Sequence, residues 1–358
     1  MTSGERFSDL RVLRWADRIG AALADPSLGS ARDDLARVGP IRCNLDLTNL
    51  CSHHCYFCEP AEYRAETVRD EKHTLDTERA FEVLEDLKSL DCKTVNFSGG
   101  GEPTLHPDFG WILTRAAAMG FRTWVVTHGG LMHKWFAEIH RADHVRVSLD
   151  ASNEEEHQQM HRAKPGEFGR VIENIRTLVR ERASRSNPEV GIAYILTNAN
   201  SEEESLRRVL EFAEDAGVDF VHFRPISEEE GGGSFTQSWV FLSEQIERLA
   251  GEYPSVNVYP LGKRLRDVFT QREFSKCYAA YTLAVVGANG DVQACCDRRD
   301  IVFGNVYEKR FKNIWLSEAH RERADKIVPQ FCQRCLMCGT NRAIERYVVR
   351  NEALAELL

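Results

Sequence analysis

Six short apolar segments alternate with amphipathic helices through the first two thirds of the chain, and this alternation constrains the fold most. In the first predicted helix, Ala80, Phe81, Leu84 and Leu87 share one face, as expected for a helix that packs on a sheet. Strands separated by helices predict βα repeats and a parallel sheet. Because a closed barrel of this kind has eight repeats, we expect an α/β fold in the form of an open, TIM-like partial (β/α)6 barrel. The predicted strands span residues 43–47, 94–97, 123–127, 144–149, 192–196 and 220–224, and the helices lie near 77–90, 107–119, 131–140, 167–184 and 202–215.

The sequence divides into four predicted segments. Residues 1–40 are polar and helical in pattern, 41–226 hold the partial barrel, and a glycine-rich stretch opens a linker with a connecting helix over 227–275. The last segment, 276–358, predicts a small domain of one β-hairpin followed by helices. Its hairpin turn is Asn289-Gly290, a strong signal for such a turn. The hairpin strands are expected at 281–286 and 292–296, and the helices near 313–326 and 341–357.

Charge and hydropathy exclude several classes of protein. The 358 residues include 46 Lys and Arg against 55 Asp and Glu, a net charge of −9, which argues against nucleic-acid partners and against adhesion to an anionic membrane. The chain shows no signal peptide, and no apolar run approaches the ~20 residues that cross a bilayer. We therefore expect a cytoplasmic protein. In that compartment its eleven cysteines more often bind metal than form disulfides.

The first cysteine group follows the first predicted strand. Cys51, Cys55 and Cys58 have the spacing C-x3-C-x2-C. Three thiolates on so short a loop can hold an iron–sulfur cube and leave one of its four irons without a protein ligand. An open metal position of this kind can bind a substrate or a cofactor. The alternative is a zinc site with His53 or His54 as the fourth ligand.

The residues around this group resemble the radical S-adenosylmethionine (radical SAM) family, whose signature is C-x3-C-x-aromatic-C. The resemblance covers about residues 41–226. Its motifs come at the ends of successive predicted strands, the edge at which α/β folds hold ligands. The matching residues are Phe57 before Cys58, the Gly-Gly-Glu motif at Gly100, Gly101 and Glu102, Thr127 after the third strand, and the segment from Ser148 to Asp150 after the fourth.

The resemblance implies that SAM binds at these residues. Asn198 follows the fifth strand and Arg224 ends the sixth, at the same edge. Arg224 is expected to bind the SAM carboxylate or a substrate anion, or to form a structural ion pair. Reductive cleavage of SAM would then give a 5′-deoxyadenosyl radical that abstracts a substrate hydrogen. No catalytic proton acceptor is identified, although His53, His54, Tyr56, Glu59 and His128 lie near this edge.

A second cysteine group lies in the last segment. Cys277 and Cys295 bracket the predicted hairpin, and Cys332 and Cys335 form a C-x-x-C pair. After a radical SAM core this pattern resembles the SPASM/Twitch extension, in which Cys, Gly-x4-Cys and C-x-x-C ligate an auxiliary [4Fe–4S] cluster. Gly290 to Cys295 fits the middle element. The sequence has too few cysteines for a second auxiliary cluster, which favours the shorter Twitch form. A zinc ribbon is the alternative.

Four cysteines remain outside the two predicted sites. Cys43 and Cys92 are expected in the core, and Cys296 is expected on the opposite strand face from Cys295. Cys338 is a possible substitute for one of the four auxiliary ligands.

A cluster with four cysteine ligands has no open iron, so electron transfer is its expected role. The resemblance extends to aminocyclitol- and sugar-modifying members of antibiotic biosynthesis. It implies an oxidoreductase that dehydrogenates a secondary alcohol of a small polar substrate, such as a sugar, aminocyclitol or nucleoside, with a flavodoxin- or ferredoxin-type electron donor. The alternatives are a redox-neutral or decarboxylating reaction on a sugar acid or nucleoside, modification of a ribosomal peptide, and a zinc-binding module that is not an enzyme.

Overall fold

The computed structural model of the protein describes residues 39–58, 74–182, 188–225, 238–259, 261, 274–332 and 335–350. The predicted N-terminal helical segment lies almost entirely outside these residues, as do the glycine-rich part of the linker and the end of the predicted last helix. Contacts divide the chain into two units. One comprises residues 46–74 and 96–265, and the other comprises residues 1–45, 75–95 and 266–358.

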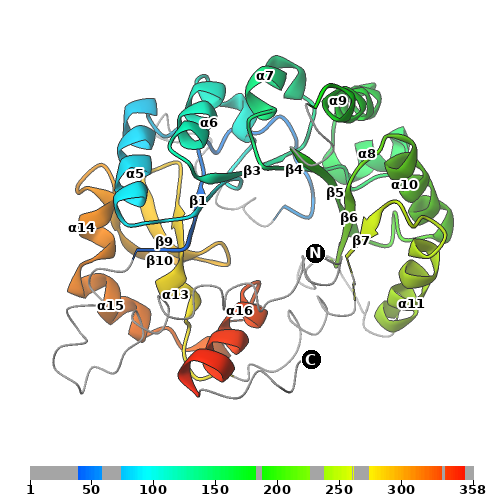
Figure 1. The fold of residues 1–358 in the computed structure, drawn as a ribbon. Helices are drawn as coiled ribbons and strands as arrows, with labels where there is room; N and C mark the ends of the chain where they lie inside the picture. Colours follow the sequence, from blue (N-terminus) through cyan, green and yellow to red (C-terminus); the bar gives the residue numbers. More distant parts are fainter. Residues whose placement is uncertain are drawn as a thin grey trace. The chain divides into compact units, whose positions relative to one another are not determined.

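The unit formed by residues 46–74 and 96–265 is built on a parallel sheet. Neighbouring strands pair in chain order, β3 with β4, β4 with β5, β5 with β6 and β6 with β7, and every pair is parallel. Figure 1 shows the helices along the outer side of this row of strands. The strands are β3 (Arg122–Thr127), β4 (His144–Ser148), β5 (Glu189–Leu196), β6 (Phe220–Pro225) and β7 (Asn257–Val258); the helices are α6 (Phe109–Ala118), α7 (Phe136–Ile139), α8 (Glu154–His161), α9 (Glu167–Glu181), α10 (Glu203–Asp215) and α11 (Ser238–Ala250).

Sequence periodicity explains how these helices cover the sheet. Helix α9 buries Val171, Ile175 and Leu178 at three- and four-residue spacing, the stripe that an amphipathic helix turns toward a sheet. Strand β5 is buried along nearly all its length, as expected for a parallel strand that is covered on both faces. The predicted parallel α/β architecture is thereby confirmed in this unit.

The other unit joins β1 to the C-terminal segment. Its strand order is β10–β9–β8–β1, with β8 parallel to β1 and with β9 antiparallel to both β8 and β10. The strands are β1 (Arg42–Leu45), β8 (Leu283–Val286), β9 (Asp291–Cys295) and β10 (Arg298–Asn305); the helices are α5 (Thr77–Ser89), α13 (Ala279–Thr282), α14 (Phe311–Trp315), α15 (Glu318–Asp325) and α16 (Cys338–Ala343), and a π-helix follows over Ile344–Val349. The unit boundary falls within β2 (Thr94–Phe97).

The predicted hairpin is confirmed by the structure. Gly290 lies between β8 and β9 with φ +86°, and a Cβ there would come within 2.5 Å of the Tyr307 ring. Only glycine meets both conditions at low cost. Several features differ from the sequence-based expectation. Strand β10 and helix α8 were not predicted, and the helix expected near 313–326 is two short helices that Ser317 separates by capping the second. The helix expected near 131–140 is reduced to a 3-10 turn and the short α7, and the first two residues of the strand expected at 281–286 belong to α13.

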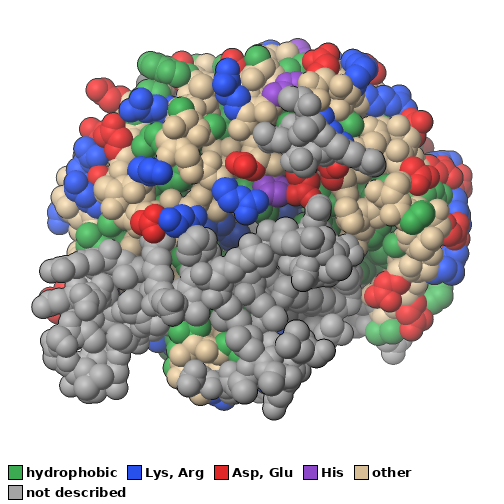
Figure 2. Space-filling view, viewed as in Figure 1, with side chains coloured by type: hydrophobic (Ala, Val, Ile, Leu, Met, Phe, Trp, Pro, Cys, Tyr) green, Lys and Arg blue, Asp and Glu red, His purple; other side chains and the backbone are tan. Residues whose placement is uncertain are grey.

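The exposed charges have mixed signs. On the face drawn in Figure 2, acidic and basic side chains are interspersed among the described residues. None of the helices in the described part of the chain is both long and apolar enough to span a bilayer.

Candidate functional site: two cysteine centres

The first cysteine group lies on the loop that follows β1. Cys51, Cys55 and Cys58 are half-buried and form no disulfide with the described cysteines, and the N–H of Cys58 donates to the Cys55 carbonyl at 3.2 Å in a tight turn. This loop is tied to the Gly-Gly-Glu segment by two backbone hydrogen bonds. The Gly101 N–H donates to the Thr48 carbonyl at 2.8 Å, and the Glu102 N–H donates to the Leu50 carbonyl at 2.7 Å.

The close approach of these two loops explains the glycines. Gly100 has φ +63°, and a Cβ there would lie 2.2 Å from Asn49 Oδ1. A Cβ on Gly101 would lie 2.1 Å from the Leu50 carbonyl oxygen. Any side chain at either position would force the loops apart, so the glycines hold the cysteine loop against the segment that ends in Glu102.

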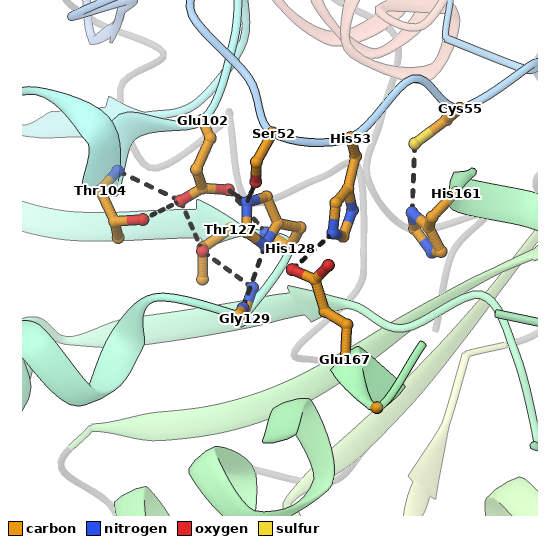
Figure 3. A network of polar contacts seen from close by, with 12 residues as sticks. Ser52, His53, Cys55, Glu102, Thr104, Thr127, His128, Gly129, His161 and Glu167 are labelled. Atoms are coloured by element: carbon orange, nitrogen blue, oxygen red, sulfur yellow. Dashed lines mark hydrogen bonds and ion pairs between the residues drawn. The ribbon is translucent and has the colours of Figure 1, made fainter. Parts of the chain in front are cut away.

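Glu102 is the centre of a hydrogen-bond network at the end of β3 (Figure 3). One carboxylate oxygen accepts from the Thr104 N–H at 3.1 Å, from the Thr104 hydroxyl at 2.6 Å and from the Thr127 hydroxyl at 2.6 Å. The other accepts from the His128 N–H at 2.8 Å. The structure therefore brings together Glu102 and Thr127, which the sequence placed on two separate motifs.

Four buried histidines lie beside the cysteine loop. The His53 ring stacks on His128 at 4.0 Å between centroids and lies 5.6 Å from His157 and 5.0 Å from His161. Burial lowers the pKa of His53, lowers that of His157 to about 4 and lowers that of His161 well below its usual value. These three rings are therefore neutral at pH 7. Sequence reasoning noted His53 and His128 but missed His157 and His161, which lie on the unpredicted α8.

Hydrogen bonds fix the position of the proton on the His128 ring, and His161 and His53 each have polar contacts of their own. His128 Nδ1 accepts from the Gly130 N–H at 3.0 Å, so its proton lies on Nε2, which faces the Ser52 hydroxyl at 3.0 Å. His161 Nε2 lies 3.0 Å from the Leu149 carbonyl, and its Nδ1 lies 3.1 Å from Cys55 Sγ. His53 Nε2 pairs with the Glu167 carboxylate at 3.1 Å (Figure 3). The protonated Nε2 makes His128 a hydrogen-bond donor rather than a metal ligand here.

The remaining residues predicted near SAM fall into different environments. Phe57 is half-buried and meets the His161 ring edge-on at 5.7 Å. Ser148 is half-buried at the end of β4, Asn198 is exposed, and Arg224 is half-buried on β6. The neighbouring Asn200, which the sequence did not single out, is buried and donates to the carbonyls of Asp150 and Ile195 at 2.9 and 2.7 Å.

Asp150 is fully buried at the end of the Ser-Leu-Asp segment. Its carboxylate accepts from the Ile195 N–H at 2.6 Å and lies 3.5 Å from His161 Nε2. Its backbone is left-handed, with φ +51°. Burial raises the pKa of Asp150 to about 7, although the Ile195 N–H and the charges of Arg224 and Arg146 oppose the rise.

The second cysteine group surrounds one pocket in the unit that contains β8, β9 and β10. Cys277, Cys295, Cys332 and Cys335 all line it, together with Asp297, Arg298 and Asn341. Cys338 does not line it: its side chain is fully buried in an apolar cluster with Phe274, Tyr278 and Ile344. Cys296 also lies outside the lining, next to Cys295. The four cysteines expected to be ligands thus line one pocket, and their two neighbours Cys296 and Cys338 are not part of that lining.

Burial favours the protonated form of two of these thiols. It raises the pKa of Cys277 to about 11 and raises that of Cys295 still further. Iron–sulfur clusters are bound by thiolates, so loading of this site must displace protons.

Both sites fit iron–sulfur chemistry in their donor sets. The first offers three thiols on one short loop, and beside it the Asn49 amide is 1% exposed with no hydrogen-bond partner for either polar atom among the described residues. A buried amide without a partner is costly, and a polar cofactor next to Gly100 would satisfy it. The second offers four thiols around one pocket, the number of ligands that a closed cluster needs.

Comparison with known proteins agrees with both sites. Residues 45–210 match the radical SAM superfamily, and residues 277–338 match SPASM, an iron–sulfur cluster-binding domain. The chain is 27% identical over 210 residues to a probable GTP 3′,8-cyclase of Metallosphaera sedula, an alignment that covers 57% of this chain and 62% of the relative. It is 29% identical over 188 residues to dTDP-4-amino-4,6-dideoxy-D-glucose ammonia-lyase of Streptomyces venezuelae, covering 49% and 37%. The chain therefore matches less than two thirds of the length of either relative.

A solved structure shows the same fold. SuiB of Streptococcus suis, in a structure bound to S-adenosylmethionine, superposes with a TM-score of 0.65 at 16% identity, covering 82% of this chain and 72% of SuiB. The predicted partial barrel with a C-terminal extension is confirmed by this likeness. A radical SAM domain uses a [4Fe–4S] cluster with SAM, and a SPASM domain binds an auxiliary iron–sulfur cluster. The chain thus carries a radical SAM domain followed by a SPASM-type auxiliary-cluster domain.

Proposed function

We propose that this protein is a radical SAM oxidoreductase that dehydrogenates a secondary alcohol of a small polar substrate. Cys51, Cys55 and Cys58 would hold the SAM-binding cluster, and Cys277, Cys295, Cys332 and Cys335 would hold the auxiliary cluster. When bound, the first cluster and SAM supply a radical that removes a hydrogen atom from the substrate. The observation that carries the oxidative proposal is the pocket lined by four cysteines.

Four protein thiolates complete the coordination of a [4Fe–4S] cluster. A site of this kind has no open iron for a substrate and is suited to receive an electron. A secondary alcohol that has lost a hydrogen atom becomes a carbonyl when it also loses one proton and one electron. The four-cysteine site would receive that electron, and the proton would leave to a base. The first electron, which starts SAM cleavage, would come from a flavodoxin- or ferredoxin-type donor.

Residues of the barrel unit would place SAM. Glu102 is held rigidly by four donors from Thr104, Thr127 and His128, and a carboxylate held in this way is suited to accept hydrogen bonds from the SAM amino group. The Asn49 amide, which has no hydrogen-bond partner among the described residues, lies against Gly100. Phe57, Ser148, Asp150, Asn198 and Arg224 remain predicted contacts of the cofactor region.

A polar, sugar-like substrate is supported by similarity to the Streptomyces venezuelae aminosugar ammonia-lyase. That relative's name also favours a second candidate reaction, the redox-neutral elimination of ammonia from an amino sugar. Similarity to the probable GTP 3′,8-cyclase keeps a nucleotide substrate as a third option. The auxiliary site favours oxidation among these, because it gives the substrate's electron a destination.

The test is an anaerobic incubation of reduced, cluster-loaded protein with SAM and a panel of amino sugars, aminocyclitols and nucleotide sugars. We expect 5′-deoxyadenosine together with a product two mass units lighter than the substrate, and deuterium at the carbinol carbon should appear in 5′-deoxyadenosine. Cys51→Ala, Cys55→Ala and Cys58→Ala should each abolish 5′-deoxyadenosine formation. A product that has lost ammonia, or one of unchanged mass, would replace the dehydrogenase proposal with an elimination or a rearrangement.

A further inference from the structure

Two hydrogen-bond donors in the auxiliary-cluster pocket face cysteine sulfurs. Arg298 Nη1 lies 3.9 Å from Cys332 Sγ, and Asn341 Nδ2 lies 3.7 Å from Cys335 Sγ. Arg298 and Asn341 both line the pocket with the four cysteines. The guanidinium nitrogen of Arg298 and the amide nitrogen of Asn341 can only donate hydrogen bonds, so each contact has one direction, from nitrogen to sulfur.

The direction of the Arg298 side chain is fixed by Asp300. Arg298 Nε donates to Asp300 Oδ1 at 2.8 Å, and Nη2 donates to Asp300 Oδ2 at 2.7 Å. This bidentate pair occupies one edge of the planar guanidinium. The remaining nitrogen, Nη1, is left facing Cys332. Arg298 is the first residue of β10 and pairs with Cys295 in the strand register, so the backbone also holds it beside the cysteines.

The orientation of the Asn341 amide is fixed by a backbone group. Asn341 Oδ1 accepts from the Ala279 N–H at 2.8 Å, and the residue is 1% exposed. Because a backbone N–H can only donate, the amide oxygen must be the atom that faces Ala279. The amide nitrogen therefore faces Cys335, without the usual ambiguity between the two ends of an asparagine side chain.

One carboxylate also lines this pocket, and its charge acts on a bound cluster in the opposite sense to a hydrogen-bond donor. Asp297 lines it, and its Oδ2 accepts from the Leu336 N–H at 3.0 Å, which holds the turn after Cys335. A carboxylate beside a cluster disfavours the addition of an electron, because reduction makes the cluster more negative.

We propose that Arg298 and Asn341 raise the reduction potential of the auxiliary cluster by donating hydrogen bonds to its cysteine ligands. Donors to ligand sulfurs stabilise the more negative, reduced cluster. The inference rests on the proposed function, in which this site receives the electron released as the substrate is oxidised. The two side chains would make that transfer favourable without touching the substrate.

The test uses the full-length protein with Cys51, Cys55 and Cys58 all changed to Ala, so that the auxiliary cluster is the one cluster expected. After anaerobic reconstitution, iron and sulfide are counted and the cluster is titrated with dithionite under EPR detection. Arg298→Gln and Asn341→Leu are introduced separately; the second keeps the size of the side chain, adds no charge beside the cluster and loses the donor. Two matched controls remove an arginine that is not part of the pocket lining: Arg299→Gln, whose side chain donates to Gln293, and Arg342→Gln, whose side chain donates to the buried Cys338.

At the midpoint potential of the parent protein, each pocket variant should raise the ratio of oxidised to reduced cluster at least tenfold, which is about 59 mV for one electron. Each control should change the ratio less than twofold. If the oxidised-to-reduced ratio in both pocket variants is the same as in the controls, the inference is overturned and the proposed function stays intact. A parent protein that binds no cluster would instead overturn the auxiliary site itself. If one pocket variant fails to bind a cluster, the other decides the question.

Discussion

The Thr127 hydroxyl donates a 2.6 Å hydrogen bond to the buried carboxylate of Glu102. This contact joins the glycine-rich segment after β2 to the end of β3. With the two backbone bonds from Gly101 and Glu102 to the cysteine loop, it makes one connected structure of three motifs that are far apart in the sequence. A substitution at Glu102 should therefore affect both SAM binding and the integrity of the site.

Glu102→Gln should weaken SAM binding at least tenfold, because the loss of a charge-assisted hydrogen bond costs about 1.5–3 kcal/mol. It should also destabilise the fold, since the new amide N–H would face the His128 N–H. Equilibrium dialysis of SAM with cluster-loaded protein measures the first effect, and urea unfolding measures the second. The exposed Glu173→Gln on α9 is the control with the same chemical change. Unchanged SAM affinity in the Glu102 variant would remove this residue from the binding site.

Cys335, which precedes α16, and Cys338, its first residue, should differ in their roles. Cys335 lines the four-cysteine pocket, whereas Cys338 is buried in the apolar cluster. Cys335→Ala should uncouple 5′-deoxyadenosine formation from product formation or destabilise the domain, and it should lower the iron content. Cys338→Ala should keep the iron and lose about 1 kcal/mol of stability from packing. Full turnover in the Cys335 variant would contradict the electron-acceptor role, and iron loss on replacing Cys338 alone would contradict its exclusion from the ligand set.

A buried carboxylate ties α5 to the segment before α14. Asp86 is 1% exposed and accepts from Arg310 Nη2 at 2.9 Å, from Arg310 Nε at 3.0 Å and from the Lys312 N–H at 3.3 Å. Asp86→Asn should lower the free energy of unfolding by about 2–3 kcal/mol. Glu85→Gln removes the adjacent pair with Arg310, which spans 3.6 Å and is half exposed; it should cost less than about 1 kcal/mol. Equal losses in urea unfolding would show that the buried pair is no stronger than the surface pair.

The pH dependence of stability should carry a contribution from Asp150. Its pKa is about 7 in the folded protein against 3.8 for an ordinary aspartate, so the folded state binds this proton more tightly than the unfolded state. The resulting stabilisation is complete below pH 3.8 and is lost as the pH rises to about 7, by up to about 4 kcal/mol. Asp150→Asn keeps an oxygen for the Ile195 N–H and should flatten this part of the profile. The measurement is chemical unfolding of the apoprotein from pH 4 to pH 8, with the exposed Asp215→Asn as the control. Identical pH profiles for the parent protein and Asp150→Asn would mean that Asp150 is ionised throughout, and would contradict the prediction.

Periodicity and motif spacing were sufficient to predict the parallel strands, the hairpin and both groups of cysteines. The hairpin was predictable because Asn289-Gly290 specifies a local turn. Strand β10 was not, since its register shifts between Arg298 and Gly304 break the alternation that identifies a strand. Helix α8 was missed because its buried face carries Glu156, His157 and His161 along with Met160, so it lacks an apolar stripe.

The histidine cluster illustrates what sequence could not supply. His53, His128 and His161 come from three segments, and only the packing of the barrel unit brings their rings within stacking distance. The same holds for Arg298 and Asn341, whose significance depends on which atom faces which sulfur. Cys338 was ambiguous by spacing alone; in the structure it is buried in an apolar cluster, against which Cys335 packs, and it does not line the pocket.

The central claim is that two separate sets of cysteines hold two iron–sulfur clusters. Iron and acid-labile sulfide analysis of the anaerobically reconstituted protein, with Mössbauer spectra, tests it most directly. We predict about eight irons and eight sulfides per chain, and about four of each when either Cys51, Cys55 and Cys58 or Cys277, Cys295, Cys332 and Cys335 are changed to Ala. Zinc without sulfide, or an iron content that neither set of substitutions lowers, would contradict the account.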